Sequence, residues 1–371
     1  MQQLEAKLRR GMTQNSLDKA TQNEIVSFIT SFARYGFPES HAASFAIIAY
    51  ASAYLKCHYL PAFTAALLNN QPMGFYHPAT LIKDAQRHGL KVKPVDVIVS
   101  DWPCTLEPDS SGGGHPFCLR LGLHQVRGLP EASAKALVRE RQVRPFTCVE
   151  DLTLRVPELQ KDELVMLAQI GALNPVGAQP VSENCPAEFS AQAPALIPSR
   201  HRRDALWQVE RAVQPAGVLF EQIETEDIAS PLEPMSLEER LAADFHGTGL
   251  SLGPHPMAYC RPQLPRSVKR AIDLKQLPHG SRVRVAGSVI VRQRPGTAKG
   301  FIFLSLEDET GIANVIIVPK LYEKTRLWVT EEKYLLVEGI IQNVDSVVHV
   351  KARTLQPLKV KGSSPPSRDF H

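Results

Sequence analysis

The sequence predicts a multidomain α+β protein in which helical segments come first and a small β-barrel follows near the C-terminus. A chain of 371 residues is long enough for two or three domains. Apolar residues recur with helical spacing in the first 70 residues, whereas they alternate with polar residues between 280 and 355. This change of period indicates separate helical and β domains.

Residues 1–70 are predicted to form helices that are interrupted near residue 37. Four apolar residues are spaced as on one face of a helix, namely Ile25, Phe28, Ile29 and Phe32. Gly36 and Pro38 break this pattern, and Ser40 is placed to cap the next helix. Pro61 marks the start of a further helix, because the first turn of a helix tolerates proline.

The segment 37–72 carries Ser40, His41 and Lys56 in an otherwise apolar sequence. Such donors can face an anionic ligand, since a lysine ammonium acts as a point charge for phosphate. The alternative is a packed helix pair with one capping serine and surface cations. Spacing alone favours this alternative, because single His and Lys residues are weak signals.

Residues 119–142 have the pattern of a helix-hairpin-helix motif. Its turn and following helix supply the candidate DNA-backbone residues Arg127, Gly128, Leu129, Lys135 and Arg139. A hairpin of this kind points backbone N–H groups and a helix N-terminus at a DNA phosphate, without base contacts. Pro130 stands where the motif usually has a second glycine, and proline removes one donor. A purely structural hairpin is the open alternative.

The composition changes again on both sides of this motif. Residues 71–113 predict one helix, one strand and an exposed turn at 110–114, and residues 159–174 predict a second, weaker helical unit. Residues 174–199 are rich in proline, alanine and serine, which predicts a flexible linker. Residues 200–279 are a predicted helical connector, in which Ser236 caps a helix with Glu238 and Glu239 in its first turn.

Residues 280–355 contain five short strand-like runs, which predicts a closed or partly open barrel such as an OB-fold. Arg282 and Arg284 point outward if the valines between them and after them point inward. OB-folds bind single strands through a basic groove and stacked aromatic rings. The candidate groove residues are the cations Arg282, Arg284, Arg292, Arg294, Lys299 and Lys320 and a stacking ring supplied by Phe301, Phe303 or Tyr322. The alternative is a barrel that serves as a spacer or protein contact, with Phe303 in its core.

The charge distribution favours an anionic partner for this C-terminal part. Residues 280–361 hold 13 Lys and Arg against 8 Asp and Glu, a net charge of +5, whereas the whole chain carries +4. The six cysteines are scattered without a Cys-x-x-Cys pair, as expected of reduced thiols in the cytoplasm. We expect no membrane association, since the N-terminus has no signal-peptide pattern and the longest apolar stretch, 45–55, is too short to span a bilayer.

The sequence offers no set of catalytic residues. Metal-dependent nucleotidyl transfer needs carboxylates that converge on paired Mg²⁺ ions, and no Asp-x-Asp pair occurs. Glu307, Asp308 and Glu309 fall in a strand-ending turn of the predicted barrel, where acidic residues are ordinary turn formers. We therefore predict no catalytic residue, no metal site and no cofactor in this chain.

Taken together, long segments of the chain resemble the C-terminal half of the bacterial DNA polymerase III alpha-subunit family. The similarity is closest to its error-prone, damage-inducible branch. Besides the hairpin, the segments are YGFPESHAASFAIIAYASAYLKCHYLPAFTAALLNNQPMGFY, HGLKVKPVDV, GTGLSLGPHPM and VRVAGSVIVRQRPGTAKGFIFLSLEDETGIANVII. The resemblance covers the chain apart from the linker and the last ten residues.

The resemblance implies an order of domains. Residues 1–110 would be the C-terminal part of the fingers domain, 115–173 the helix-hairpin-helix region, 280–355 the OB domain and 356–371 a tail. Ser40, His41 and Lys56 would line the side of the fingers that faces the incoming nucleotide and the template. The hairpin would grip the duplex backbone, and the barrel would meet the single-stranded template.

The resemblance also implies what this chain lacks. The family's PHP domain and its palm, which carries the catalytic carboxylates and Mg²⁺, would precede residue 1. This chain alone is therefore predicted to be inactive in the family's reaction, DNA-directed DNA synthesis across damaged template. Expected partners are single-stranded DNA and primer-template, and beyond these the sliding clamp or other damage-tolerance proteins. Residues 214–220 loosely resemble a clamp-binding peptide, but their spacing is two residues longer than usual, which favours the alternative that they are linker or packing. The alternatives are an interaction scaffold in a repair complex and a nonfunctional remnant of a split gene.

Overall fold

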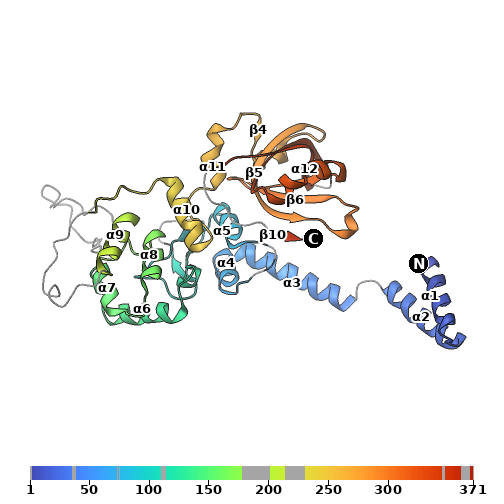
Figure 1. Ribbon diagram of the computed structural model, residues 1–371, viewed down its shortest axis with the longest axis horizontal. Coiled ribbons are helices and arrows are strands. Elements are labelled where there is room, and N and C mark those ends of the chain that lie inside the picture. The colour runs from blue at the N-terminus through green and yellow to red at the C-terminus, as the bar shows by residue number, and fades with distance from the viewer. Residues whose placement is uncertain are drawn as a thin grey trace. The chain divides into compact units, whose positions relative to one another are not determined.

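The computed structural model describes residues 2–35, 39–72, 74, 76–109, 114–177, 201–213, 230–344, 347–360 and 368–370 (Figure 1). The chain divides into two compact units, Met1–Tyr59 and Leu60–His371. Most of the predicted linker lies outside the described residues, as do residues 110–113 of the predicted turn and the segment 214–220. None of the helices in the described ranges has the length and apolarity that crossing a membrane requires.

The first unit consists of three helices: α1 (Gln2–Gln14), α2 (Lys19–Tyr35) and α3 (Glu39–His58). Met12 and Val26 are buried between α1 and α2, and Arg9 donates a hydrogen bond of 2.8 Å to Asn23. Helix α3 begins at Glu39, one residue before the predicted cap at Ser40. Every described side chain from 41 to 50 on α3 is exposed, although most of them are apolar.

The second unit begins with helices and a small sheet around one apolar core. Helices α4 (Leu60–Asn69) and α5 (Pro78–Arg87) come first, and the sheet follows in the order β1–β3–β2, formed by β1 (Val92–Lys93), β2 (Thr105–Pro108) and β3 (Phe117–Arg120). The strand predicted near residues 90–100 is thus only two residues long, because Pro94 ends it and the chain then turns. Leu68, Ile82, Leu119, Leu137 and Leu167 are completely buried in this core.

The helical region continues through the hairpin and the connector. Its elements are η1 (Leu123–Gln125), α6 (Glu131–Val143), α7 (Val149–Arg155), α8 (Lys161–Gln169), α9 (Arg202–Ala212), α10 (Leu237–Thr248) and α11 (Pro256–Cys260). The predicted cap of α10 is confirmed, since Ser236 accepts a hydrogen bond of 3.2 Å from the backbone N–H of Glu239. The side chain of Glu239 accepts one of 2.7 Å from the N–H of Ser236 in return, which completes a capping box.

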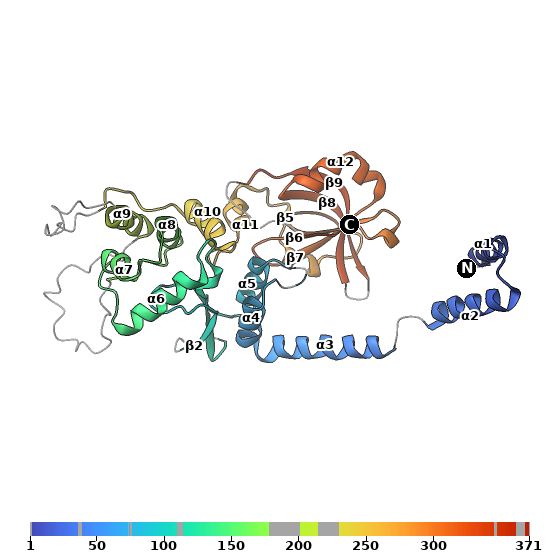
Figure 2. The same ribbon diagram turned by 60° about the horizontal axis from the view of Figure 1, so that its bottom comes forward.

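The predicted barrel is confirmed as a closed five-stranded structure (Figure 2). It consists of β5 (Arg282–Gln293), β6 (Ile302–Glu307), β7 (Ile312–Ile317), β8 (Tyr334–Val344) and β9 (Val347–Pro357). Neighbours pair in the order β5–β6–β7–β9–β8, and β8 pairs with β5 to close the ring. Only the β7–β9 pairing is parallel within this ring of described strands. This arrangement confirms the multidomain α+β class.

Shorter elements complete the barrel. Helix α12 (Pro319–Glu331) connects β7 to β8 and was not predicted from the sequence. The other additions are β4 (Val268–Lys269), η4 (Ala271–Gln276), η5 (Gly296–Ala298) and β10 (Arg368–Phe370), of which β4 and β10 pair in parallel with β5. Val283 and Val285 lie in the barrel core, so the predicted inward direction of the valines is confirmed. Gly339 allows a very close approach of β8 to β9, because a Cβ there would lie 2.4 Å from the carbonyl oxygen of Lys351.

Candidate nucleic-acid interface

The outer surface of the barrel carries a row of side chains that lie opposite one another on successive strands. The row consists of Arg282, Ile340, Lys351, Ile316, Phe303 and Gln293. Residues directly opposite in neighbouring strands point to the same face of a sheet. Arg282 and Lys351 are exposed, and the other four are half-buried. We call these six residues the outer row.

Phe303 belongs to this outer surface and not to the barrel core, where the alternative interpretation placed it. An aromatic ring with an aliphatic neighbour and a cation nearby is the composition of a single-strand stacking surface. Lys351 and Arg353 were missed in the sequence analysis, although they alternate with the buried Val350 and Ala352. The same period-two pattern that identified Arg282 could have found them.

A second cationic group lies on the loop between β5 and β6 and on the start of α12. The guanidinium carbon of Arg294 lies 5.1 Å from the ring centre of Tyr322, a cation–π contact. Lys299 adopts a left-handed conformation with φ of 51° and is exposed, as is Lys320. Phe301 is half-buried at the end of this loop. The structure therefore brings the side chain of Arg294 next to the aromatic ring of Tyr322.

Two predicted groove residues have structural partners. Arg284 donates a hydrogen bond of 2.9 Å to Glu338, which lies directly opposite it on β8. Arg292 donates to the carbonyl oxygens of Val329 and Glu332 at the end of α12, both at 2.5 Å. A cation at the C-terminus of a helix compensates the unpaired carbonyl groups there. Arg292 therefore holds α12 on the barrel.

The hairpin turn lies between the three-residue 3-10 helix η1 and α6, so the first helix of the predicted hairpin is only one short turn, because residues 117–120 form β3. Gly128 has φ of 78°, a conformation that favours glycine, and Leu129 is buried beneath the turn. Pro130 occupies the N-cap position of α6, and no side chain caps this helix end. The N–H groups of the first helical turn are therefore not satisfied by a capping side chain, which suits the binding of a phosphate.

The cations around this turn differ in how firmly they are held. Arg127 is exposed but bound to α10, since its backbone N–H donates to Gly247 at 2.7 Å and its side chain to His246 at 3.4 Å. Lys135 forms an exposed ion pair of 2.8 Å with Glu131. Arg139 lies 3.3 Å from both Glu140 and Glu158, and hydrogen bonds to these carboxylates raise the pKa of its guanidinium. Such exposed pairs are weak and can exchange for a phosphate.

The polar residues of α3 do not form a common site. His41 lies at the start of the helix with its ring 4.5 Å from that of Phe45, whereas the half-buried Lys56 lies near the end. Fifteen residues of helix separate the two by about 22 Å. The side chain of Ser40 lies outside the described residues.

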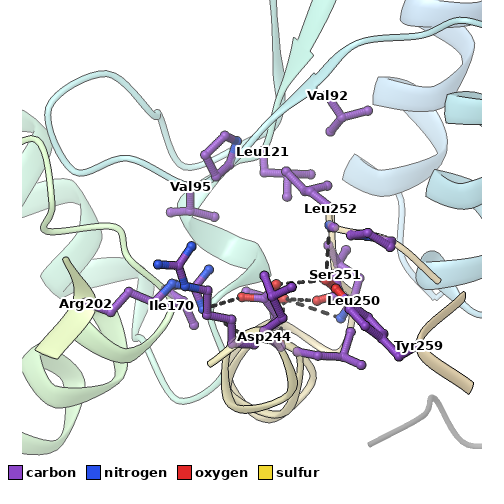
Figure 3. A pocket seen from close by; sticks show the side chains of 17 residues that line it. Val92, Val95, Leu121, Ile170, Arg202, Asp244, Leu250, Ser251, Leu252 and Tyr259 are labelled. Carbon is purple, nitrogen blue, oxygen red and sulfur yellow. Dashed lines mark hydrogen bonds and ion pairs between the residues drawn. The ribbon is translucent and has the colours of Figure 1, made fainter. Parts of the chain in front are cut away.

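A cavity of about 340 Å³ lies between the small sheet, α8 and α10 (Figure 3). Its walls are mainly apolar, with Val95, Leu121 and Leu252 among them. Three of its polar residues contact one another: Asp244 forms an ion pair of 2.7 Å with Arg202 and accepts a hydrogen bond of 2.8 Å from Ser251. Both oxygens of Asp244 are therefore engaged in these contacts.

The acidic residues Glu307, Asp308 and Glu309 of the barrel are each engaged in ion pairs or hydrogen bonds. No cluster of three or more potential metal ligands occurs among the residues that the structure describes. Asp308 is the predicted turn former, since its side chain accepts from the N–H groups of Thr310 and Gly311 at 2.7 and 3.0 Å. Glu307 is not an ordinary turn residue, because it is 2% exposed and forms an ion pair with Arg87 at 2.7 Å.

Two family models match parts of the chain. Residues 89–180 match a helix-hairpin-helix motif, and residues 283–358 match an OB-fold nucleic acid binding domain. Both matches fall on the regions in which the candidate DNA-binding residues lie, so nucleic-acid binding by these two regions has support independent of the geometry.

Relatives of the whole chain are error-prone DNA polymerases. The one from Anaeromyxobacter dehalogenans (strain 2CP-1 / ATCC BAA-258) is 42% identical over 99% of this chain and 31% of its own length. That from Azoarcus sp. (strain BH72) is 42% identical over 100% of this chain and 33% of its own length. "Error-prone DNA polymerase 2" of Rhizobium meliloti (strain 1021) is 40% identical, over 98% and 32%. The chain thus spans about a third of the length of these relatives.

Solved structures match only locally. Asparaginyl-tRNA synthetase from Pyrococcus horikoshii has a TM-score of 0.23 and 24% identity over 26% of this chain and 24% of its own. The OBody AM1L10 bound to hen egg-white lysozyme has a TM-score of 0.22 and 18% identity over 26% of this chain and 94% of its own. At these scores neither likeness bears on function.

Proposed function

Because the chain belongs to the error-prone DNA polymerase family, we propose that it is the C-terminal, DNA-binding part of such a polymerase. This polymerase would act in DNA damage tolerance, where it would copy damaged template DNA in the cytoplasm. The catalytic palm and PHP domains and the Mg²⁺ ions would belong to the rest of the polymerase. The contribution of this chain would be to hold the single-stranded template and the duplex.

The observation that carries this proposal is the outer row of the barrel. Arg282 and Lys351 supply exposed cations on the same surface as Phe303 and Ile316. A single strand binds such a surface by placing bases on the aromatic ring and phosphates near the cations. The hairpin adds a phosphate site of a different kind, which recognises backbone and not base.

We expect removal of the two exposed cations of the outer row, Arg282→Ala with Lys351→Ala, to weaken single-strand binding roughly 10- to 30-fold near 0.1 M salt. Each lost phosphate contact lowers the slope of log K against log salt by about 0.7 for a single strand. The measurement is fluorescence anisotropy with a labelled oligonucleotide over a salt series. The matched control removes two cations from α1, Lys7→Ala with Arg10→Ala. Equal losses in both variants would contradict a specific role for the outer row.

We expect Gly128→Ala to weaken binding of a blunt duplex about 5- to 10-fold and to leave single-strand binding unchanged. Alanine at φ of 78° is strained by about 1 kcal/mol, and relief of that strain would turn the N–H groups away from the phosphate. Gly89→Ala introduces the same strain at φ of 86° without a nearby turn of this kind. The hairpin role fails if both variants bind the duplex as tightly as the wild type does.

A protein-interaction role is the second candidate, and α3 is the feature that favours it. Its exposed apolar side chains include Phe45, Ile47, Ile48 and Tyr50, of which Tyr50 is 75% exposed. Helices that are apolar on all sides are normally buried in a larger protein. In the proposed polymerase, α3 belongs to the fingers, and Ser40 and His41 at its start and Lys56 near its end would meet the nucleotide side at two separate points and not as one site.

A further inference from the structure

An ion pair between the half-buried Arg87 and the buried Glu307 connects the barrel to α5. Glu307 is the last residue of β6, and its Oε1 accepts a hydrogen bond of 2.7 Å from Nη2 of Arg87. Its Oε2 lies 3.4 Å from the hydroxyl of Thr80, also on α5. Arg87 donates a second bond, of 3.1 Å, to the carbonyl oxygen of Asp308. One face of α5 is therefore bound to both the side chain and the backbone of the β6–β7 turn.

A third element closes this junction from another side. The ammonium of Lys83 donates a hydrogen bond to the carbonyl oxygen of Gly253 in the loop 251–255. The side chain of Gln86 donates one of 3.1 Å to the carbonyl oxygen of Leu252 in the same loop. At the end of this loop, Nε2 of His255 lies 3.9 Å from Oε2 of Glu307. Lys83 is 9% exposed and His255 is 7% exposed, so the junction is closed to water on these sides. We call Thr80, Lys83, Arg87, His255 and Glu307 the junction cluster.

Helix α5 is itself part of the core that supports the hairpin. Ala79, Ile82 and Ala85 are buried in the same apolar cluster as Leu129 of the hairpin turn and Ala134 of α6. The side chains of a close-packed core interdigitate, so the core has low compressibility and a displacement of one element also displaces the elements packed against it. The path from the outer row to the hairpin thus runs through the barrel, the junction cluster, α5 and one continuous core.

We infer that Arg87 and Glu307 are positioning residues, which hold the barrel at a set distance from the hairpin so that both bind one nucleic acid at once. Neither residue touches the nucleic acid. The inference rests on the proposed function and adds a requirement to it, namely that the ligand has a duplex segment and a single-stranded segment in one molecule. When two sites are held together, the second binding event is intramolecular, and total affinity exceeds that of either site. A loosened junction lowers the effective concentration and loses this advantage.

The test uses the full chain and three labelled ligands: a single strand, a blunt duplex, and a duplex with a single-stranded extension. We expect wild-type protein to bind the extended duplex at least 10-fold more tightly than either separate segment. Arg87→Ala should reduce this advantage to about 2-fold or less, while both separate affinities stay within about 2-fold of wild type. Arg87→Lys keeps the charge at Glu307 and should restore most of the advantage.

The control is Arg270→Ala, which removes the same side chain from an exposed ion pair with Asp273. It changes the net charge equally, so a general electrostatic loss would appear in both variants. Glu307→Gln tests the junction from the barrel side. The inference is overturned if Arg87→Ala and Glu307→Gln keep the wild-type advantage, or if wild type binds both segments without any advantage. Absence of binding to either segment by wild type would instead overturn the proposed function.

Discussion

Gly339→Ala should destabilise the barrel by about 3 kcal/mol, which is the upper part of the usual range for overpacking. A Cβ at this position would lie 2.4 Å from the carbonyl oxygen of Lys351 and 2.7 Å from a methyl group of Val350. The first of these contacts is with backbone, so the strands β8 and β9 would have to separate. Urea denaturation of the full chain measures the effect.

The control for this substitution is Gly296→Ala in the β5–β6 loop. No atom lies within 4 Å of a Cβ at that position. We expect Gly296→Ala to leave stability unchanged or to raise it by a few tenths of a kcal/mol, since alanine restricts the unfolded chain. If the two variants unfolded at the same denaturant concentration, the close approach of the strands at Gly339 would not be a constraint.

Acidification should destabilise the second unit through His255. Burial, together with the positive charges of Arg87, Lys83 and Arg261, lowers the pKa of His255 to about 3. In the unfolded chain the imidazole of His255 takes up a proton near the ordinary histidine pKa of about 6.5, whereas in the folded chain this imidazole stays neutral down to about pH 3. Stability is therefore lost as pH falls through this window, and the loss from this group at pH 5 is about 2 kcal/mol.

The variant His255→Asn isolates this contribution. Nδ1 of His255 accepts a hydrogen bond from the N–H of Met257 as the cap of α11, and asparagine is a good cap without a titrating ring. We expect the variant to lose about 2 kcal/mol less stability than wild type between pH 7 and pH 5. The exposed His279, changed to Gln, is the control. Burial raises the pKa of Glu307, so protonation of this carboxyl stabilises the folded chain as pH falls, which opposes the effect of His255. The contribution of His255 is therefore measured as the difference between the variant and the wild type.

The parts of the fold that could be predicted are those with a strong local period. Alternating valine and arginine identified β5 and the outward direction of Arg282, and the same reasoning applied to 350–353 would have identified Lys351. Helix α12 was missed because its exposed face carries Leu327, which is 63% exposed, so that its apolar residues do not form a single stripe. The short β1 could not be told from a longer strand, because only Pro94 limits it.

The candidate site divides in a similar way. Gly128 and the turn around it could be predicted from local sequence. The cation–π pair of Arg294 could not, because its partner Tyr322 lies on α12, which was not predicted. The roles of Arg292 and Glu307 depend on partners far along the chain. Glu307 is 220 residues from Arg87, and no local pattern distinguishes its buried carboxylate from the turn-forming Asp308 beside it.

The division of the chain at Tyr59 also has a practical side. The large exposed apolar residues of α3 all precede Leu60, whereas the hairpin, the junction cluster and the barrel all follow it. A truncated version beginning at Leu60 would therefore keep both candidate DNA-binding regions. It would remove the exposed apolar side chains of α3, which favour aggregation at high concentration. Crystallisation of a nucleic-acid complex would begin most reasonably from that shorter polypeptide.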